Sequence, residues 1–205
     1  ANSINYLALL YQDEGQYARA EPLLERALAI REKALGPDNR ELTVSLGNLA
    51  ALYQAEGQYA KAEPLFVRAL AIREKVFGPN SRGTAISLSN LAELYKDEGQ
   101  YAKAEPLFVR ALSIIEKTLG PEHTDTATSL NNLAFLYRSQ GQYTKAEPLF
   151  VRALAINEKV LGLDHPRTAQ SLNNLASSKA FCCTRASPMP TTRTGPKRSR
   201  GFMTT

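Results

Sequence analysis

The sequence predicts an all-α protein, built as a solenoid of antiparallel helix pairs, and three observations support this. The stretch GQYAKAEPLFVRAL occurs at 57–70 and again at 99–112, with near-copies at 15–28 and 141–154. The copies are spaced 42 residues apart, and a fixed period of this size is typical of stacked helical repeats. Within one period, apolar residues recur at helical spacing, and no stretch shows the period-two alternation of a half-buried strand.

The first predicted helix of each repeat carries its apolar residues on one face. In the second repeat, Leu46, Leu49, Ala50 and Tyr53 stand at positions i, i+3, i+4 and i+7 of such a helix. Gly57 then interrupts the pattern. Alanine recurs at the place of Ala50 in the other repeats, and a small side chain there lets two helices approach closely.

A second predicted helix follows and ends at Gly78, where proline comes next and cannot continue it. Pro64 lies several residues inside this helix and removes one backbone hydrogen bond. We therefore expect a loose or bent first turn from Tyr59 and a tight helix from near Ala62. The expected apolar stripe consists of Tyr59, Ala62, Phe66, Ala69, Leu70 and either Ile72 or Arg73. The expected solvated outer face carries Arg68, Arg73, Glu74 and Lys75.

The repeats predict one domain over residues 1–178. Its units span about 1–42, 43–84, 85–126 and 127–168, and a half unit at 169–178 adds one extra helix. A single helix pair cannot bury its own apolar faces, so stacking of units must supply a continuous core. Neither end carries a polar capping unit, and we therefore expect exposed apolar patches and possible self-association through the uncapped ends.

Residues 179–205 are predicted to form a basic, disordered tail. They contain six basic residues and no acid, whereas residues 1–178 carry 19 basic and 20 acidic residues. The body of the chain thus gives no electrostatic reason to expect nucleic acid as a partner. The adjacent Cys182 and Cys183 cannot form a disulfide framework or a zinc site alone. Whether this tail is native or a frameshift product is left open.

The repeated motifs resemble the tetratricopeptide repeat, in the 42-residue form of kinesin light chains. The usual unit has about 34 residues, and the additional ones extend the second helix and add a loop that begins Gly-Pro, as at Gly36 and Gly120. Leu-Asn-Asn-Leu-Ala at 130–134 and 172–176 fits the same type, and near-identical units are typical of bacterial arrays. The tryptophan usual at the fourth position is replaced by Ile4 in the first unit and by leucine in the later units. The matching residues of the second repeat are Leu46, Leu49, Ala50, Tyr53, Gly57, Tyr59, Ala62, Phe66 and Ala69.

The resemblance implies that the first helices line the concave face of a superhelix and that a peptide binds there. Asparagine is a mediocre helix former, so its recurrence at 48, 90, 132 and 174 needs a reason. Its amide can hold the backbone of an extended peptide, or it can bond between neighbouring first helices and only hold the stack together. The predicted groove residues are Asn5, Asn48, Asn90, Glu93, Lys96, Asn131, Asn132, Phe135, Arg138 and Asn174.

Two cations in this set have two interpretations each. Lys96 and Arg138 either attract acidic side chains of a partner or are solvated residues near a helix end. The resemblance therefore implies a protein–protein interaction scaffold that binds an extended peptide of a partner protein. The alternative is a structural module that self-stacks or oligomerises and has no peptide ligand.

No motif indicates an enzyme. The chain lacks GxxxxGK[ST], GxGxxG after a strand, HExxH and GxSxG, and we predict no catalytic residue, cofactor or metal site. His123 and His165 each stand in a loop between units, where we expect a structural or helix-capping role. No apolar run approaches the ~18 residues that a membrane helix needs, and no leader is visible, so we expect a cytoplasmic protein without a membrane partner.

Overall fold

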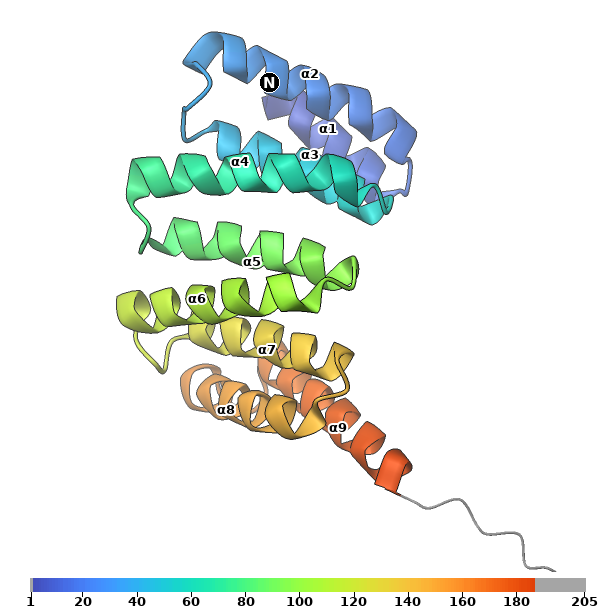
Figure 1. Cartoon of the computed structure of the whole chain (residues 1–205), viewed down its shortest axis with the longest axis vertical. Helices are drawn as coiled ribbons and strands as arrows, with labels where there is room; N and C mark the ends of the chain where they lie inside the picture. The colour runs from blue at the N-terminus through green and yellow to red at the C-terminus, as the bar shows by residue number, and fades with distance from the viewer. Residues whose placement is uncertain (1, 187–205) are drawn as a thin grey trace, which may run out of the picture.

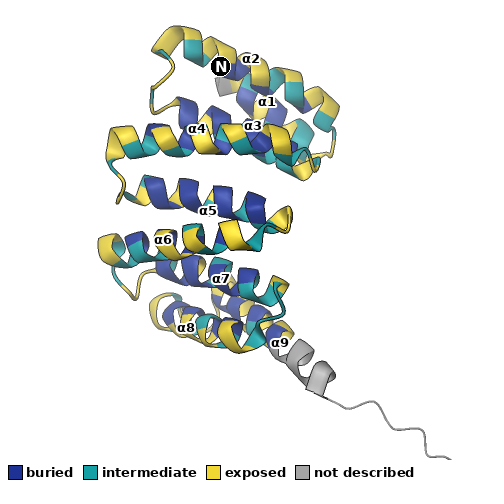
Figure 2. Cartoon of the chain, viewed as in Figure 1, coloured by how far each residue is buried: buried dark blue, intermediate teal, exposed yellow. Residues whose placement is uncertain are grey.

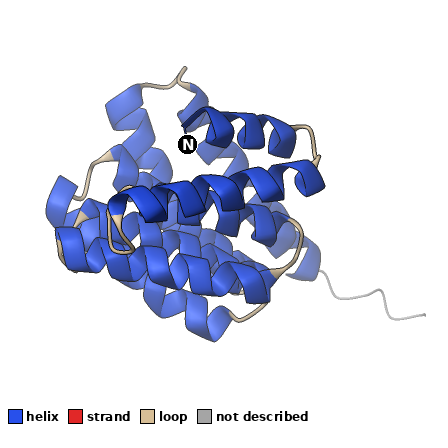
Figure 3. Cartoon of the chain, turned by 90° about the horizontal axis from the view of Figure 1, so that it is seen from above, coloured by secondary structure: helices blue, strands red, loops and turns tan. Residues whose placement is uncertain are grey.

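Nine α-helices occupy residues 2–186, the part of the chain that the computed structural model describes, with side-chain surroundings described for residues 3–178. They follow one another along the long axis of the molecule (Figure 1), and no strand occurs among these residues (Figure 3). The predicted all-α solenoid is confirmed. The helices are α1 (Asn2–Asp13), α2 (Tyr17–Leu35), α3 (Leu42–Ala55), α4 (Tyr59–Phe77), α5 (Arg82–Asp97), α6 (Tyr101–Leu119), α7 (Thr124–Ser139), α8 (Tyr143–Leu161) and α9 (Pro166–Ala186).

The apolar stripes of the first and second helices form the core. Leu46 and Ala50 in α3 are fully buried, and Phe66 in α4 is 4% exposed. Their equivalents in α5 to α8 are buried in the same way, along the helix sides that face neighbouring helices (Figure 2). Each helix packs on the helices before and after it in the chain, so the core runs from unit to unit as stacking requires.

Tyrosines near the ends of the first helices join each unit to the one before it. The Tyr95 hydroxyl donates to Glu63 Oε1 of the preceding unit at 2.6 Å, and the Lys103 ammonium lies 4.9 Å from the centre of the ring. Burial, and then the hydrogen bond to Glu63, raise the pKa of Tyr95 to about 12. Tyr53 and Tyr137 repeat the arrangement with Glu25 and Glu105. Tyr53 and Tyr95 are 6% and 8% exposed, as the predicted place of Tyr53 on the apolar face of its helix requires.

Charges on the second helices link consecutive units. Arg110 Nη2 in α6 donates to Glu74 Oε1 in α4 at 2.7 Å and to the Pro79 carbonyl at 3.2 Å. Arg68 and Arg152 make the corresponding bonds one unit earlier and one unit later. The expected solvated face is thus also a row of ion pairs between units.

Arg73 departs from that expectation. Its guanidinium is half-buried and donates to the Gly83 carbonyl at the start of α5 at 2.7 Å. Burial lowers the pKa of this side chain. Arg73 therefore points to the first helix of the next unit rather than to the outer face, because it lies one residue beyond the buried Ile72 on the inner edge of the stripe.

The first turn of α4 is hydrogen-bonded, so the expectation of a loose turn before Pro64 is wrong. The Lys61 and Ala62 N–H groups both donate to the Gln58 carbonyl, at 3.0 and 3.2 Å. Proline fixes a φ that suits a helix, and the turn before it finds its own partners. The preceding helix, α3, ends at Ala55, and Gly57 beyond it has a φ of 72°, which permits the Gln58 N–H to reach the Tyr53 carbonyl at 2.8 Å.

The loops between units cap the first helices. His123 Nδ1 accepts the Asp125 N–H at 3.0 Å, and His165 Nδ1 accepts the Arg167 N–H at 3.1 Å. Ser81 does the same for the Thr84 N–H. The expected capping role of the histidines is confirmed. Each cap lies before the predicted unit boundary, so α5, α7 and α9 begin three residues before the boundaries at 85, 127 and 169.

The C-terminal boundary of the repeat domain stays a prediction. The backbone of α9 continues as a helix past residue 178, to Ala186. Residues 187–205, most of the predicted tail, lie outside the described residues.

Candidate functional site

Three hollows lie between successive first helices. The α3/α5 hollow has a volume of about 390 Å³, the α5/α7 hollow about 230 Å³ and the α7/α9 hollow about 420 Å³. Each is lined by the two first helices and by the second helix that stands between them in sequence. The ion pairs between second helices lie elsewhere, so the row of hollows forms a separate, first-helix face of the solenoid.

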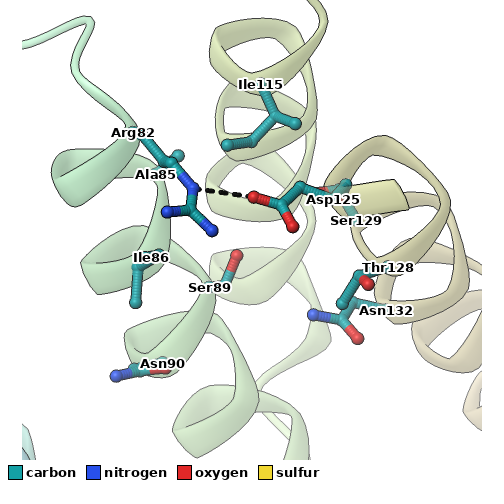
Figure 4. A pocket seen from close by; sticks show the side chains of 10 residues that line it. All are labelled: Arg82, Ala85, Ile86, Ser89, Asn90, Ile115, Asp125, Thr128, Ser129 and Asn132. Atoms are coloured by element: carbon teal, nitrogen blue, oxygen red, sulfur yellow. Dashed lines mark hydrogen bonds and ion pairs between the residues drawn. The ribbon is translucent and has the colours of Figure 1, made fainter. Parts of the chain in front are cut away.

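The α5/α7 hollow has an apolar base and a polar rim. Ile115 of α6 is 4% exposed and lines it together with Ala85 of α5. At the rim, Arg82 Nε donates to Asp125 Oδ2 at 2.7 Å, and the two side chains reach toward each other from facing helices (Figure 4). The amide and hydroxyl side chains that complete the lining are Ser89, Asn90, Thr128, Ser129 and Asn132.

The α7/α9 hollow is richer in amides. Asn157 of α8 is 5% exposed, and its Nδ2 donates to the Ser171 hydroxyl of α9 at 2.9 Å. That hydroxyl donates in turn to the Arg167 carbonyl at 3.1 Å. The Oδ1 atoms of Asn157 and Asn131 are both buried and have no hydrogen-bond donor in the described part of the chain.

The structure divides the predicted groove residues into two groups. Five of them line the hollows: Asn90 lies in the α5/α7 hollow, Asn131, Phe135 and Asn174 lie in the α7/α9 hollow, and Asn132 lines both. The edge-to-face contact of Phe135 with Phe150, at 5.2 Å between ring centres, fixes one wall.

Asn5 and Asn48 are not among the residues that line these hollows. Asn48 Nδ2 donates to Asn5 Oδ1 at 3.2 Å, and this bond ties α3 to α1. For this pair the structure shows the second of the two interpretations, in which asparagine holds neighbouring first helices together.

The predicted charged groove residues already have intramolecular partners. The Lys96 ammonium pairs with the Glu93 carboxylate one turn earlier and lies 3.7 Å from Asp97 Oδ1. The Arg138 guanidinium stacks 4.7 Å from the centre of the Phe135 ring. A partner's acidic group would have to compete with these contacts.

One set of lining residues was missed by the sequence reasoning. Arg73, Ile115 and Asn157 occupy the same position of successive second helices and line the α3/α5, α5/α7 and α7/α9 hollows respectively. The signal was present in the repeat RALAI-x-EK, where x changes from Arg to Ile to Asn while its neighbours barely change. A position that varies inside near-identical repeats is free to serve something other than stacking.

The described residues carry neither a membrane-spanning helix nor a cluster of metal ligands. No helix there combines the length and apolarity needed to cross a bilayer, and no three His, Cys, Asp or Glu side chains gather as a metal site would require. The predicted cytoplasmic location remains a prediction.

Comparisons with known proteins agree with this architecture. The family model for the tetratricopeptide repeat matches residues 1–75, 41–111, 84–157 and 125–180. A search of curated proteins finds no match. A crystal structure of nearly identical TPR-like repeats from a Podosopora anserina protein of kinesin-light-chain type is 33% identical, covers 90% of this chain and 87% of its own, and has a TM-score of 0.75.

Two other solved structures resemble the chain. BtubC (BKLC) from P. vanneervenii is 27% identical, with 98% of this chain and 85% of that chain covered and a TM-score of 0.73. A Rap protein complexed with competence and sporulation factor shares the fold, at 18% identity and a TM-score of 0.69 over 89% of this chain and 50% of that one. The family match spans the whole repeat region and the first of these structures repeats its architecture, so the chain belongs to the tetratricopeptide repeat family, in its kinesin-light-chain-like form.

Proposed function

We propose that this chain is a protein–protein interaction scaffold whose first-helix face holds an extended peptide segment of a partner protein. The observation that carries this proposal is the α5/α7 hollow, where Asn90 and Asn132 of facing helices line one cavity with an apolar base. Tetratricopeptide repeats are scaffolds typical of protein–protein interaction rather than enzymes, and the family membership supports the same class of function.

The lining chemistry suits a peptide backbone. An extended peptide offers alternating N–H and C=O groups, and an asparagine amide can both donate to and accept from them. The side chain of Asn132 makes no hydrogen bond within the part of the chain that the structure describes, so its amide is open to such a contact. A protein that shares this fold has been solved with a partner bound, namely a Rap protein complexed with competence and sporulation factor.

A specific observation also favours the second candidate, a self-stacking module without a peptide ligand. Leu7 and Leu10 of α1 are 43% and 53% exposed, and Leu172 of α9 is 47% exposed. Exposed apolar side chains thus gather on α1, and on the described part of α9 Leu172 is exposed. Self-association through them would bury these side chains and needs no groove ligand.

One double variant distinguishes the peptide-binding scaffold from the self-stacking module. Asn90→Ala with Asn132→Ala removes the two asparagine amides that line the α5/α7 hollow. Under the peptide-binding proposal, peptides selected from a random nine-residue library by the unmodified chain bind the variant at least about tenfold more weakly, a loss of about 1.4 kcal/mol. Its thermal unfolding midpoint stays unchanged, because neither amide supports a contact in the stack.

The matched control is Asn80→Ala, in an exposed loop away from the hollows. It is expected to bind the same peptides as the unmodified chain. Equal peptide affinity of the double variant would contradict the proposal. A concentration-dependent sedimentation coefficient that Leu10→Gln abolishes, with no peptide recovered from the library, would establish the self-stacking alternative instead.

A further inference from the structure

We propose that one position of each second helix selects which partner side chain enters the hollow beside it, so that the groove reads a sequence as well as a backbone. We call it the floor position; it is occupied by Arg31, Arg73, Ile115 and Asn157. The α5/α7 hollow, floored by Ile115, selects an apolar side chain. The α7/α9 hollow, floored by Asn157, selects the primary amide of glutamine or asparagine. This inference rests on the proposed peptide-binding function and specifies its ligand.

In three of the four units the floor position lies beside the same serine of the next first helix, whereas Arg73 bonds to the Gly83 carbonyl. Arg31 donates to the Ser45 hydroxyl of the next first helix, and Asn157 donates to the Ser171 hydroxyl. Ile115 lines its hollow beside the equivalent Ser129. Because the serine and the helices around it repeat, the floor residue is one of the positions at which the α5/α7 and α7/α9 hollows differ chemically, together with Ile86 and Thr128 and with Ser89 and Asn131.

The α5/α7 hollow offers its base to an apolar group. Ile115 and Ala85 are almost fully buried there, and Ile86 is 42% exposed toward the same space. The two charges on its rim, Arg82 and Asp125, are paired with each other at 2.7 Å. A charged side chain in this hollow would lose its hydration and find no unpaired partner, which disfavours it.

The α7/α9 hollow needs a hydrogen-bond donor. The Ser171 hydroxyl has one proton, which it gives to the Arg167 carbonyl, so Asn157 must present its nitrogen to Ser171 and keep its oxygen unpaired. Asn157 Oδ1 and Asn131 Oδ1 are consequently two buried acceptors without a donor. A buried acceptor of this kind raises the free energy of the fold until a donor reaches it.

Among donors, a neutral amide fits best. No carboxylate lines this hollow, and its one charged residue is the cation Arg167, so a lysine ammonium would be buried without a counter-charge. A carboxylate brings no donor for the two oxygens. A primary amide brings two N–H donors, and its own oxygen can accept from the neighbouring amides of Gln170 or Asn174.

The test exchanges floor residues and reads the selected side chains. A random nine-residue peptide library displayed on phage is selected against the full chain, and synthetic peptides from it are measured by fluorescence anisotropy. For the unmodified chain we expect an apolar residue at one peptide position and glutamine or asparagine at another. Asn157→Leu should replace the amide preference by an apolar one, with at least about a tenfold loss for the original amide peptide.

Two further variants sharpen the result. Asn157→Asp keeps the volume of the side chain and should turn the amide preference into one for lysine or arginine. Ile115→Asn should introduce an amide preference at the formerly apolar position and leave the other position unchanged. If Ile115→Asn lowers the thermal midpoint, Ile115→Thr serves in its place with a smaller change of volume.

The outcomes separate this inference from the function on which it rests. Peptides that bind folded floor variants with the preferences of the unmodified chain would overturn the selection by floor residues and leave peptide binding standing. No peptide bound by the unmodified chain would overturn both. Preferences that move with the floor residue, at the expected peptide position, would establish the inference.

Discussion

The two ends of the first-helix face use the same amino acid in opposite ways. Between α1 and α3, Asn48 and Asn5 are hydrogen-bonded to each other and Asn5 is 8% exposed. Between α7 and α9, Asn131 and Asn157 instead keep buried oxygen atoms without a donor. Asn131 and Asn174 stand at the repeat positions of Asn5 and Asn48, yet the Asn131 oxygen has no donor among the described residues, so the role of an asparagine in a near-identical repeat is not assigned by its position alone.

The ends of the array also differ from its interior in packing. Leu52 in α3 is fully buried beneath the preceding unit, whereas its equivalent in α1, Leu10, is 53% exposed. The residue is the same and the helix is nearly the same, but a second helix of a preceding unit covers only Leu52. Stability in such an array thus depends on nearest neighbours.

The largest expected effect tests this packing difference. Leu52→Ala should lower the free energy of unfolding by about 2–5 kcal/mol, because it opens a cavity in the core. Leu10→Ala, the matched change at the end, should cost less than about 1 kcal/mol, because its side chain is already half in water. Urea unfolding followed by circular dichroism measures both. Similar losses for the two variants would show that a covering surface, such as a second copy, buries Leu10 in solution.

An intermediate effect tests the two roles of asparagine. Asn48→Ala removes the donor to the buried Asn5 oxygen and should cost about 1–3 kcal/mol of unfolding free energy. Asn132→Ala should stay within about 0.5 kcal/mol of the unmodified chain, because its amide has no partner in the described structure. The same urea measurements decide the matter. A large loss for Asn132→Ala would place the α5/α7 asparagines with the stacking residues.

The period and the apolar stripes were enough to predict the helices, the stacking and most of the core. Leu46 and Phe66 are buried as the spacing required, since helical periodicity fixes which side chains share a face. The first-helix face could also be located, because Asn90, Asn132 and Asn174 follow from position in the repeat. Local pattern is sufficient for these features, because each depends on one helix or on one repeated contact.

The remaining features depend on pairs of residues about 40 positions apart, which no local pattern specifies. The bond from Asn48 to Asn5 and the ion pair of Arg82 with Asp125 each need a partner from another unit. Arg73 was predicted on the outer face for a related reason. A charged side chain at the edge of an apolar stripe is expected to face solvent, and the sequence does not show that the backbone of the next unit accepts its hydrogen bond. The sequence alone predicted which side chains share a face of the array, but not which residues of different units contact each other.

The smallest expected effect uses the tyrosines that join interior units. Burial and the Glu63 bond raise the pKa of Tyr95 to about 12 from its ordinary 10.0, so the folded state holds the phenol proton more tightly than the unfolded chain. This stabilisation is fully present below pH 10 and is lost as the pH rises toward 12. Tyr95→Phe should therefore lower stability by about 0.5–1.5 kcal/mol at pH 8 and make the decline between pH 10 and 12 shallower. Tyr53 and Tyr137, whose pKa values are raised for the same reason, preserve part of the decline.

Urea unfolding at pH 8, 10 and 11.5 gives the slope, and Asn80→Ala should retain that of the unmodified chain. An unchanged slope in Tyr95→Phe would mean that the contact with Glu63 does not hold the interior units together as the structure indicates.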